Sequence, residues 1–150
     1  MNRILVPVDF SPTSRKAFAF AVEMASRAGS SIILYHLYTP EKKRSIGIYH
    51  DVDAMNKKTE LNSLKRLQRL RKKVLADKND VVVSTIVGRT PLVNNILGFA
   101  EHHHIDLIIM GTQGASGLNK VTIGSVAGKV MENADVPVLL IPQKYELATI

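Results

Sequence analysis

The feature that most constrains the fold is a series of short runs of Val, Ile and Leu, separated by longer segments with helical patterning. The runs are too short for buried helices, and most of them lack the polar–apolar alternation of a strand with one solvent-facing side. Strands that are apolar throughout are typical of a parallel sheet covered by helices on both faces. The runs that we interpret as strands are Arg3–Val8, Ser31–Tyr38, Asp80–Val87, Asp106–Met110 and Val136–Ile141.

Helix signals fill the segments between these runs. Ser11 followed by Pro12 is typical of an N-cap and a first helical residue, Thr90-Pro91 repeats this pattern, and Gly29 is typical of a helix end. Because strands and helices alternate and crossovers are right-handed, we predict an open doubly wound α/β sheet of five parallel strands. The predicted helices run from Pro12 to about Ala28, from about Asn56 to Ala76, from Thr90-Pro91 to about His103 and from Ser125 to Asn133, and residues 39–56 are predicted as a loop.

Composition places the chain among globular proteins. A chain of 150 residues, 45% of them hydrophobic, is typical of a single domain spanning residues 1–150. It has no cysteine, which excludes disulfides, thiol catalysis and cysteine-based metal sites. No apolar run approaches the roughly 20 residues that a membrane-spanning helix needs, and the N-terminus lacks the features of a secretory signal. We therefore expect a cytoplasmic protein that makes no membrane contact.

The positive charge is concentrated in one part of the chain. The net charge is +7, and residues 41–80 carry twelve basic and six acidic residues. A leucine stripe marks the buried side of the helix predicted there, and we interpret the basic residues on its other faces as a solvated surface. The alternative is contact with an acidic partner; because aromatic residues are only 5% of the chain and none lies among these charges, we expect no DNA binding. The basic residues are Lys65, Arg66, Arg69, Arg71, Lys72 and Lys73.

A glycine-rich segment follows the fourth predicted strand. Gly111, Gly114, Gly117 and Gly124 lie between that strand and a helix that begins at Ser125. Glycine lets backbone amides converge on an anion, and a helix N-terminus favours phosphate. The segment matches neither the Walker A pattern nor G-x-G-x-x-G. We interpret it as a phosphate-binding loop; the alternative is a turn that packs helix against strand without a ligand.

Asp9 ends the first predicted strand, so it is expected at the same edge of the sheet as the glycine-rich segment. A carboxylate at this point can accept hydrogen bonds from both hydroxyls of a ribose. The alternative is that Asp9 only caps the helix that begins at Pro12, although Ser11 is better spaced for that role.

These residues carry a resemblance. The spacing Gly111-x2-Gly114-x9-Gly124-Ser125, with Val-Pro-Val-Asp near the N-terminus, resembles the nucleotide-binding branch of the universal stress protein family over essentially the whole chain. The resemblance implies a Rossmann-like subunit of strand order 3-2-1-4-5 that binds ATP, AMP or ADP. It also implies a homodimer in which residues 136–141 of two subunits pair antiparallel. The residues that it assigns to the nucleotide are Pro7, Val8, Asp9, Leu37, Met110, Gly111, Gln113, Gly114, Gly124 and Ser125.

Two of the assigned positions depart from the family pattern. Residues 7–9 and Leu37 would border adenine and ribose, and the residues after the fourth strand would hold ribose and phosphates. Gln113 stands where a basic residue or histidine is common, so one charge contact with the phosphates would be missing. Leu37 stands where valine is usual, and its extra methylene would narrow the adenine slot.

The sequence favours a nucleotide-dependent stress-response or signalling module over an enzyme. No base for activating water is evident, and only Asp9 and Ser125 offer oxygen ligands for Mg²⁺, so we assign no catalytic or metal-binding residue. Consecutive residues on a helix point about 100° apart, so His102–His104 are not expected to hold a metal ion. Two alternatives remain: a weak ATPase or other nucleotide-transforming enzyme of the adenine nucleotide α-hydrolase-like group, and a nucleotide-free module that docks an unknown protein partner.

Overall fold

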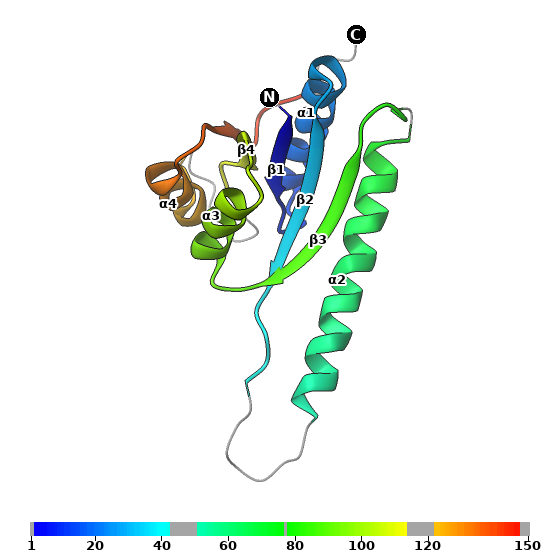
Figure 1. Cartoon of the computed structure of the whole chain (residues 1–150), viewed down its shortest axis with the longest axis vertical. Coiled ribbons are helices and arrows are strands. Elements are labelled where there is room, and N and C mark those ends of the chain that lie inside the picture. Colours follow the sequence, from blue (N-terminus) through cyan, green and yellow to red (C-terminus); the bar gives the residue numbers. More distant parts are fainter. Residues whose placement is uncertain (1, 43–50, 77, 114–121, 148–150) are drawn as a thin grey trace.

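Five parallel strands form one sheet with helices packed on both faces (Figure 1). The computed structural model describes residues 2–42, 51–76, 78–113 and 122–147. The strands are β1 (Arg3–Pro7), β2 (Ser31–Tyr38), β3 (Val83–Arg89), β4 (Leu107–Gly111) and β5 (Val138–Ile141). Their order is β3-β2-β1-β4-β5, which confirms the predicted fold class and strand order.

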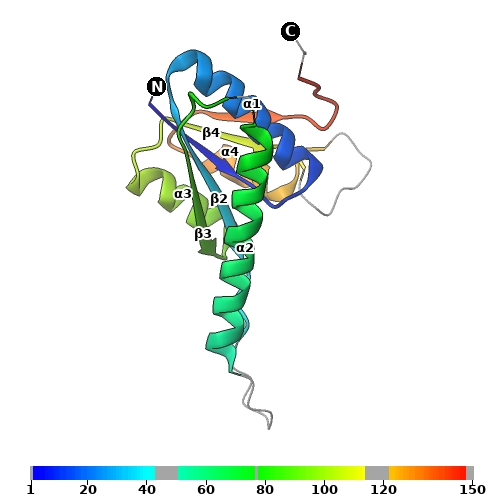
Figure 2. The same ribbon diagram turned by 90° about the vertical axis from the view of Figure 1, so that its right-hand side faces the viewer.

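Each face of the sheet has its own apolar core. The helices are α1 (Pro12–Ala28), α2 (Val52–Val74), α3 (Leu92–His102) and α4 (Ser125–Asn133). α1 and α2 cover one face, and α3 and α4 cover the other (Figures 1 and 2). Ile4 of β1 belongs to the first core with Phe18 of α1, whereas the next residue, Leu5, belongs to the second core with Ile96 of α3. Burial on both faces explains why β1 is apolar throughout.

α1 begins and ends where the local sequence predicts. The Ser11 hydroxyl accepts a hydrogen bond from the Ser14 amide at 3.2 Å, and Pro12 is the first helical residue. Gly29 adopts a left-handed conformation, with φ of 64°, and its amide donates to the carbonyl of Ala25. Both helix ends are therefore fixed by residues that are adjacent in sequence.

α2 begins four residues before the predicted Asn56, at Val52. Its N-cap is Asp51, whose carboxylate accepts a hydrogen bond from the Ala54 amide at 3.0 Å. The N-terminal half of α2 extends past the edge of the sheet (Figure 1), and Leu61 of the predicted leucine stripe is 49% exposed. The predicted loop is therefore shorter, and the apolar contact of α2 is confined to its C-terminal half.

β3 begins three residues after the predicted start at Asp80 and includes Arg89. Its seven residues pair in parallel with Ile32–Tyr38 of β2, so the neighbouring strand sets its limits. The Asp80 carboxylate precedes the strand and accepts a hydrogen bond from the Ser26 hydroxyl of α1 at 2.5 Å. The start of β3 is thus set by its hydrogen bonds to β2, and not by where the apolar run begins in the sequence. β4 and β5 also begin later than predicted, by one and two residues.

The prediction that Thr90 caps α3 with Pro91 as its first residue is wrong. Pro91 is the N-cap, its carbonyl accepts from the Asn95 amide at 3.2 Å, and the helix begins at Leu92. Thr90 instead donates its amide to the carbonyl of Tyr38 at 2.9 Å, so it prolongs the pairing of β3 with β2. The Thr90–Pro91 peptide bond is cis.

Candidate functional site

A cleft opens at the carboxyl edge of the sheet, between the ends of β1 and β4. β1 has β2 on one side and β4 on the other, so the order of the strands reverses here. About 720 Å³ of atom-free space, part of it open to solvent, lies in the cleft. Of the ten residues predicted to bind a nucleotide, Gly114 lies outside the described residues and the other nine line this cleft. They are Pro7, Val8, Asp9, Leu37, Met110, Gly111, Gln113, Gly124 and Ser125.

The turn after β1 presents Asp9 to the cleft. The Val8 amide donates to the carbonyl of Tyr35 at 2.8 Å, which holds the end of β1 against β2. The exposed carboxylate of Asp9 accepts a hydrogen bond from the Ser11 amide at 2.9 Å. Ser11, and not Asp9, is the N-cap of α1. The Asp9 carboxylate instead stabilises the turn and faces the cleft.

The N-terminus of α4 also lies at the cleft. Gly124 is its N-cap, and its amide donates to the carbonyl of Thr112 at 2.6 Å, which ties the two ends of the glycine-rich segment together. The Gly124 amide is therefore committed to the loop, contrary to the expectation that it would face an anion. The next three amides, of Ser125, Val126 and Ala127, belong to the first helical turn, where no intrahelical acceptor exists. All three residues line the cleft.

Gly111 lets β4 approach α1 closely. A Cβ atom at this position would lie 2.7 Å from Cγ2 of Thr13 and 3.1 Å from its backbone carbonyl carbon, closer than side chains normally come. The next residue, Thr112, donates its amide to the carbonyl of Ile141 at 3.0 Å. Gln113 donates a hydrogen bond from Nε2 to the carbonyl of Thr122 at 3.2 Å, so its side chain is also used within the loop.

The other part of the cleft is apolar and includes residues that sequence reasoning missed. Leu37 and Met110 are joined by Tyr35 from β2 and by Leu92 and Ile96 from α3. Leu92 and Ile96 lie one helical turn apart at the start of α3, which is the pattern of a helix face that covers the sheet edge. The sequence shows this spacing, but no neighbouring residue indicates that this face of α3 borders the cleft as well as the apolar core. The site therefore combines an apolar slot with a polar rim.

Behind the cleft, His36 supports the end of β1 from the opposite face of the sheet. Its Nδ1 donates to the carbonyl of Val8 at 2.8 Å, and its ring packs on Phe10 with centroids 4.5 Å apart. The guanidinium carbon of Arg66, in α2, lies over the Phe10 ring at 3.9 Å from its centroid. Burial lowers the pKa of His36 and Arg66 lowers it further, while the hydrogen bond to Val8 and the charge of Asp9 act in the opposite direction.

This lowered pKa predicts a pH effect on stability. As the pH falls below about 6.5, the unfolded chain binds a proton at His36 before the folded chain does, so the free energy of unfolding decreases. The contribution is complete above that pH and is lost as the pH falls toward the folded-state pKa. The His36→Asn variant keeps a donor for Val8 but cannot titrate. Urea unfolding between about pH 7.5 and pH 5 should show a shallower decline for this variant, and equal slopes would contradict the assignment.

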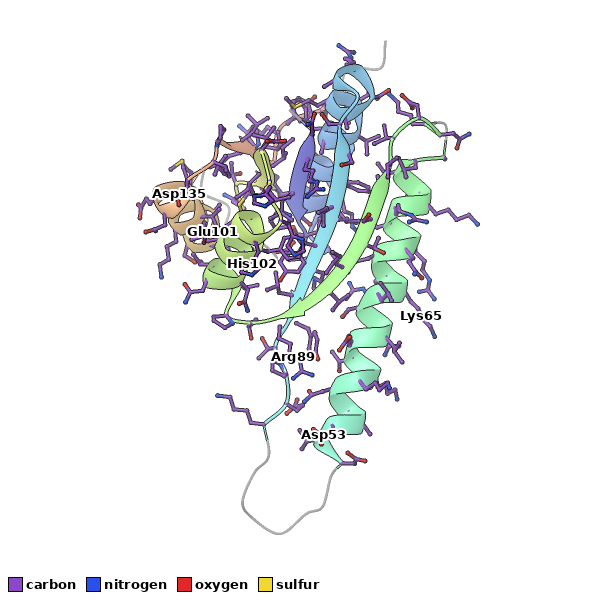
Figure 3. All side chains as sticks on the ribbon, viewed as in Figure 1. Asp53, Lys65, Arg89, Glu101, His102 and Asp135 are labelled. Atoms are coloured by element: carbon purple, nitrogen blue, oxygen red, sulfur yellow. The ribbon has the colours of Figure 1, made fainter. Side chains whose placement is uncertain are left out.

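The histidines at the end of α3 form no metal site within the described residues. His103 stacks on Phe99 with centroids 3.9 Å apart, so the ring is used in packing. Figure 3 shows His102 and Glu101 beside each other on α3, yet no group of three His, Asp or Glu side chains in the described ranges is placed to hold a metal ion. None of the described helices is both long enough and apolar enough to cross a membrane.

A doubly wound sheet with a cleft at its strand-order reversal, bordered by a helix N-terminus, defines a Rossmann-like domain with a candidate ligand site. Residues 1–142 match the universal stress protein family, and the chain belongs to this family. Its relatives include universal stress protein MJ0577 of Methanocaldococcus jannaschii, which is 30% identical over 157 residues covering 95% of this chain and 96% of that protein. Universal stress protein YxiE of Bacillus subtilis is 28% identical, with 93% of this chain and 98% of that protein covered.

Solved structures show the same fold. Universal stress protein UspA from Lactobacillus plantarum has a TM-score of 0.77 and 26% identity, with 93% of this chain and 97% of that chain covered. A universal stress protein from Archaeoglobus fulgidus, solved in complex with dAMP, has a TM-score of 0.65 and 22% identity, with 94% and 98% covered.

Proposed function

We propose that the chain binds ATP or AMP in the cleft and acts in the cytoplasm as a nucleotide-dependent stress-response or signalling module. The observation that supports this most directly is the composition of one cleft: the Asp9 carboxylate, the three N-terminal amides of α4 and an apolar slot all line it. A ribose, a phosphate chain and an adenine ring need these three kinds of surface. Universal stress proteins solved with dAMP and with cAMP share the fold, which agrees with an adenine nucleotide as ligand.

The parts of the cleft suit the parts of the ligand. Leu37 and Met110 offer apolar surface to adenine, and Asp9 can accept from the ribose hydroxyls. The amides of residues 125–127 and the Ser125 hydroxyl can donate to phosphate oxygens, and the helix dipole adds to their attraction. Because Gln113 brings no positive charge, we expect the phosphates to be held mainly by backbone amides. ATP and AMP should then differ less in affinity than they would with a basic residue at position 113.

The test is the stabilisation of the folded chain by nucleotide. A ligand at 100 times its Kd should add about 2.7 kcal/mol to the free energy of unfolding. We therefore expect thermal unfolding to shift upward with ATP and with AMP, and not with GTP at the same concentration. Gly124→Val should abolish the shift, because the new side chain would stand at the start of α4 beside the donating amides. Its φ of −62° suits valine, so the variant should still fold.

The matched control is Gly98→Val. Gly98 is exposed on α3, no atom lies within 4 Å of the point that a Cβ atom would occupy there, and the residue does not line the cleft. This variant should keep the full nucleotide shift. An unchanged shift in Gly124→Val, or no shift in the unmodified protein, would overturn the proposal. Release of phosphate above background with Mg²⁺, lost in Asp9→Ala, would make the protein an ATPase instead.

We also propose a homodimer formed through β5. This strand is at the edge of the sheet, and Val138, Leu139 and Leu140 are only half-buried in the single chain. Exposed apolar edges are normally covered, and a second copy can pair with β5 antiparallel. Sedimentation equilibrium should give the mass of two chains, and the mass of one chain at micromolar concentration would rule the pairing out.

A further inference from the structure

A second hollow lies on the sheet face that α1 and α2 cover, away from the cleft. Cations from both helices border it: Arg15 and Lys16 of α1, and Arg66, Arg69 and Lys73 of α2. We call it the basic groove. It contains about 1490 Å³ of atom-free space, much of it open to solvent, and the segment 145–147 forms its remaining side. None of the residues that line the cleft lines the basic groove.

The charges of the basic groove lack counter-charges. Arg15, Arg66, Arg69 and Lys73 form no ion pair with any carboxylate in the described part of the chain, and Glu146 is the one acidic residue on the lining. Lys16 donates to the carbonyl of Gln143 at 2.6 Å, which leaves its charge uncompensated as well. Like charges gathered on one surface repel each other, so an anionic ligand would relieve this repulsion.

Three cations of α2 share one side of the helix, next to the groove floor. Arg66, Arg69 and Lys73 follow each other at intervals of three and four residues, on the side of α2 that carries the buried Leu70. Lys65, in contrast, points away from the sheet (Figure 3) and does not line the groove. Arg66, Arg69 and Lys73 are all exposed, as the predicted solvated surface requires, and they also border the basic groove.

The floor of the basic groove is apolar. Leu70, Val74, Tyr145 and Leu147 line it, and Leu147 is 37% exposed. Phe10 also belongs to the lining but is only 8% exposed, because Arg66 covers its ring. A single-stranded nucleic acid gains affinity by stacking its bases on open aromatic faces, and the Phe10 ring is covered by Arg66, so this mainly aliphatic floor suits another kind of ligand better. A peptide with both acidic and apolar side chains fits the floor and the rim together.

We propose that the basic groove docks an acidic amphipathic segment of a partner protein. The apolar side chains of that segment would contact Leu70, Val74 and Leu147, and its carboxylates would pair with Arg66 and Arg69. Docking of an amphipathic helix in a groove between two helices is a known mode of peptide recognition. The proposal uses no residue of the nucleotide cleft and does not depend on the nucleotide.

The test is a binding measurement with a defined probe. A fluorescein-labelled peptide of about 18 residues carries Leu at helical spacing i, i+3, i+4, i+7 and Glu at the other positions, and its anisotropy is followed on titration with the full chain. We expect saturable binding that weakens with salt. The double variant Arg66→Gln with Arg69→Gln should raise Kd by about tenfold or more, because it removes charges that contact the peptide.

The control variant is Lys65→Gln with Lys72→Gln, which removes the same charge from α2 outside the groove. It should change Kd by less than about twofold. Thermal unfolding of both variants checks that Arg66 is not needed for folding. Four results would overturn the proposal: no saturable binding, equal loss in both variants, equal binding of a peptide with Gln in place of Glu, or tighter binding of a single-stranded oligonucleotide that is lost with Arg66 and Arg69.

Discussion

Replacing Phe18 by alanine is expected to lower the free energy of unfolding by about 4 kcal/mol. The Phe18 side chain is fully buried in the core between α1 and the sheet, together with Ile4 and Val22. Truncation removes the transfer free energy of an aromatic ring and leaves a cavity that a parallel sheet cannot collapse to fill. A domain has only about 5–15 kcal/mol of stability, so the variant should be close to unfolding. Urea unfolding with linear extrapolation measures the change.

The matched variant is Phe20→Ala, on the same helix. Phe20 is half-buried, and its ring meets that of Tyr145 edge to face, with centroids 5.5 Å apart. Its truncation removes less buried area and opens no closed cavity, so we expect the free energy of unfolding to fall by about 1.5 kcal/mol. Similar losses for the two variants would mean that α1 does not direct Phe18 into the core as described.

Parts of the fold that depend on neighbouring residues were predictable from the sequence. α1 needs only Ser11, Pro12 and Gly29 to fix its ends, and all three act on backbone groups within a few residues. α4 runs from Ser125 to Asn133 as predicted, because the glycine-rich segment separates it from β4. The apolar runs identified all five strands, since burial on both faces leaves a clear pattern.

Two elements, β3 and α2, were misplaced by a few positions, each for a different reason. β3 takes its limits from β2, and no property of residues 80–82 excludes them from a strand. α2 begins after its cap Asp51, within a charged segment where the capping signal was not distinguished from a loop. The limits of β3 depend on hydrogen bonds to another strand, whereas the Asp51 cap of α2 is a local signal that the interpretation of residues 39–56 as a loop overlooked.

The candidate site divides in the same way. Asp9 was predictable because carboxyl ends of parallel strands share one edge, whereas Met110 was assigned only through the family resemblance. Leu92 and Ile96 were missed because their place at the cleft depends on how α3 packs across the sheet. The commitment of the Gly124 amide to Thr112 also could not be foreseen, since it depends on how the loop closes.

One turn separates the cleft from the basic groove. Asp9 lines the cleft, and the next residue, Phe10, lines the groove. Phe10 has a φ of 65°, which is uncommon for a bulky side chain. This conformation directs its ring away from the cleft and onto His36 and Arg66. Because the cleft and the basic groove share no lining residue, the two surfaces can be tested with separate variants.

Replacing Gly111 by valine is expected to cost about 3 kcal/mol of stability, because the site has no room for a side chain. A Cβ atom would lie 2.7 Å from Cγ2 of Thr13 and 3.1 Å from the Thr13 carbonyl carbon, and the second contact is with backbone that belongs to α1. Either β4 or α1 must move, and both carry buried residues. Gly111→Ala should also lower the free energy of unfolding, by about 2 kcal/mol. Urea unfolding measures both changes.

A double-mutant cycle identifies the contact responsible. Thr13→Ala removes Cγ2 but leaves the Thr13 backbone in place. In the double variant, the methyl group introduced by Gly111→Ala therefore loses its clash with Cγ2 but keeps its close contact with the Thr13 carbonyl carbon. We expect Gly111→Ala to cost about 1 kcal/mol less in the Thr13→Ala background than in the unmodified protein. Additive losses would show that Cγ2 of Thr13 does not make the contact that excludes a side chain at position 111.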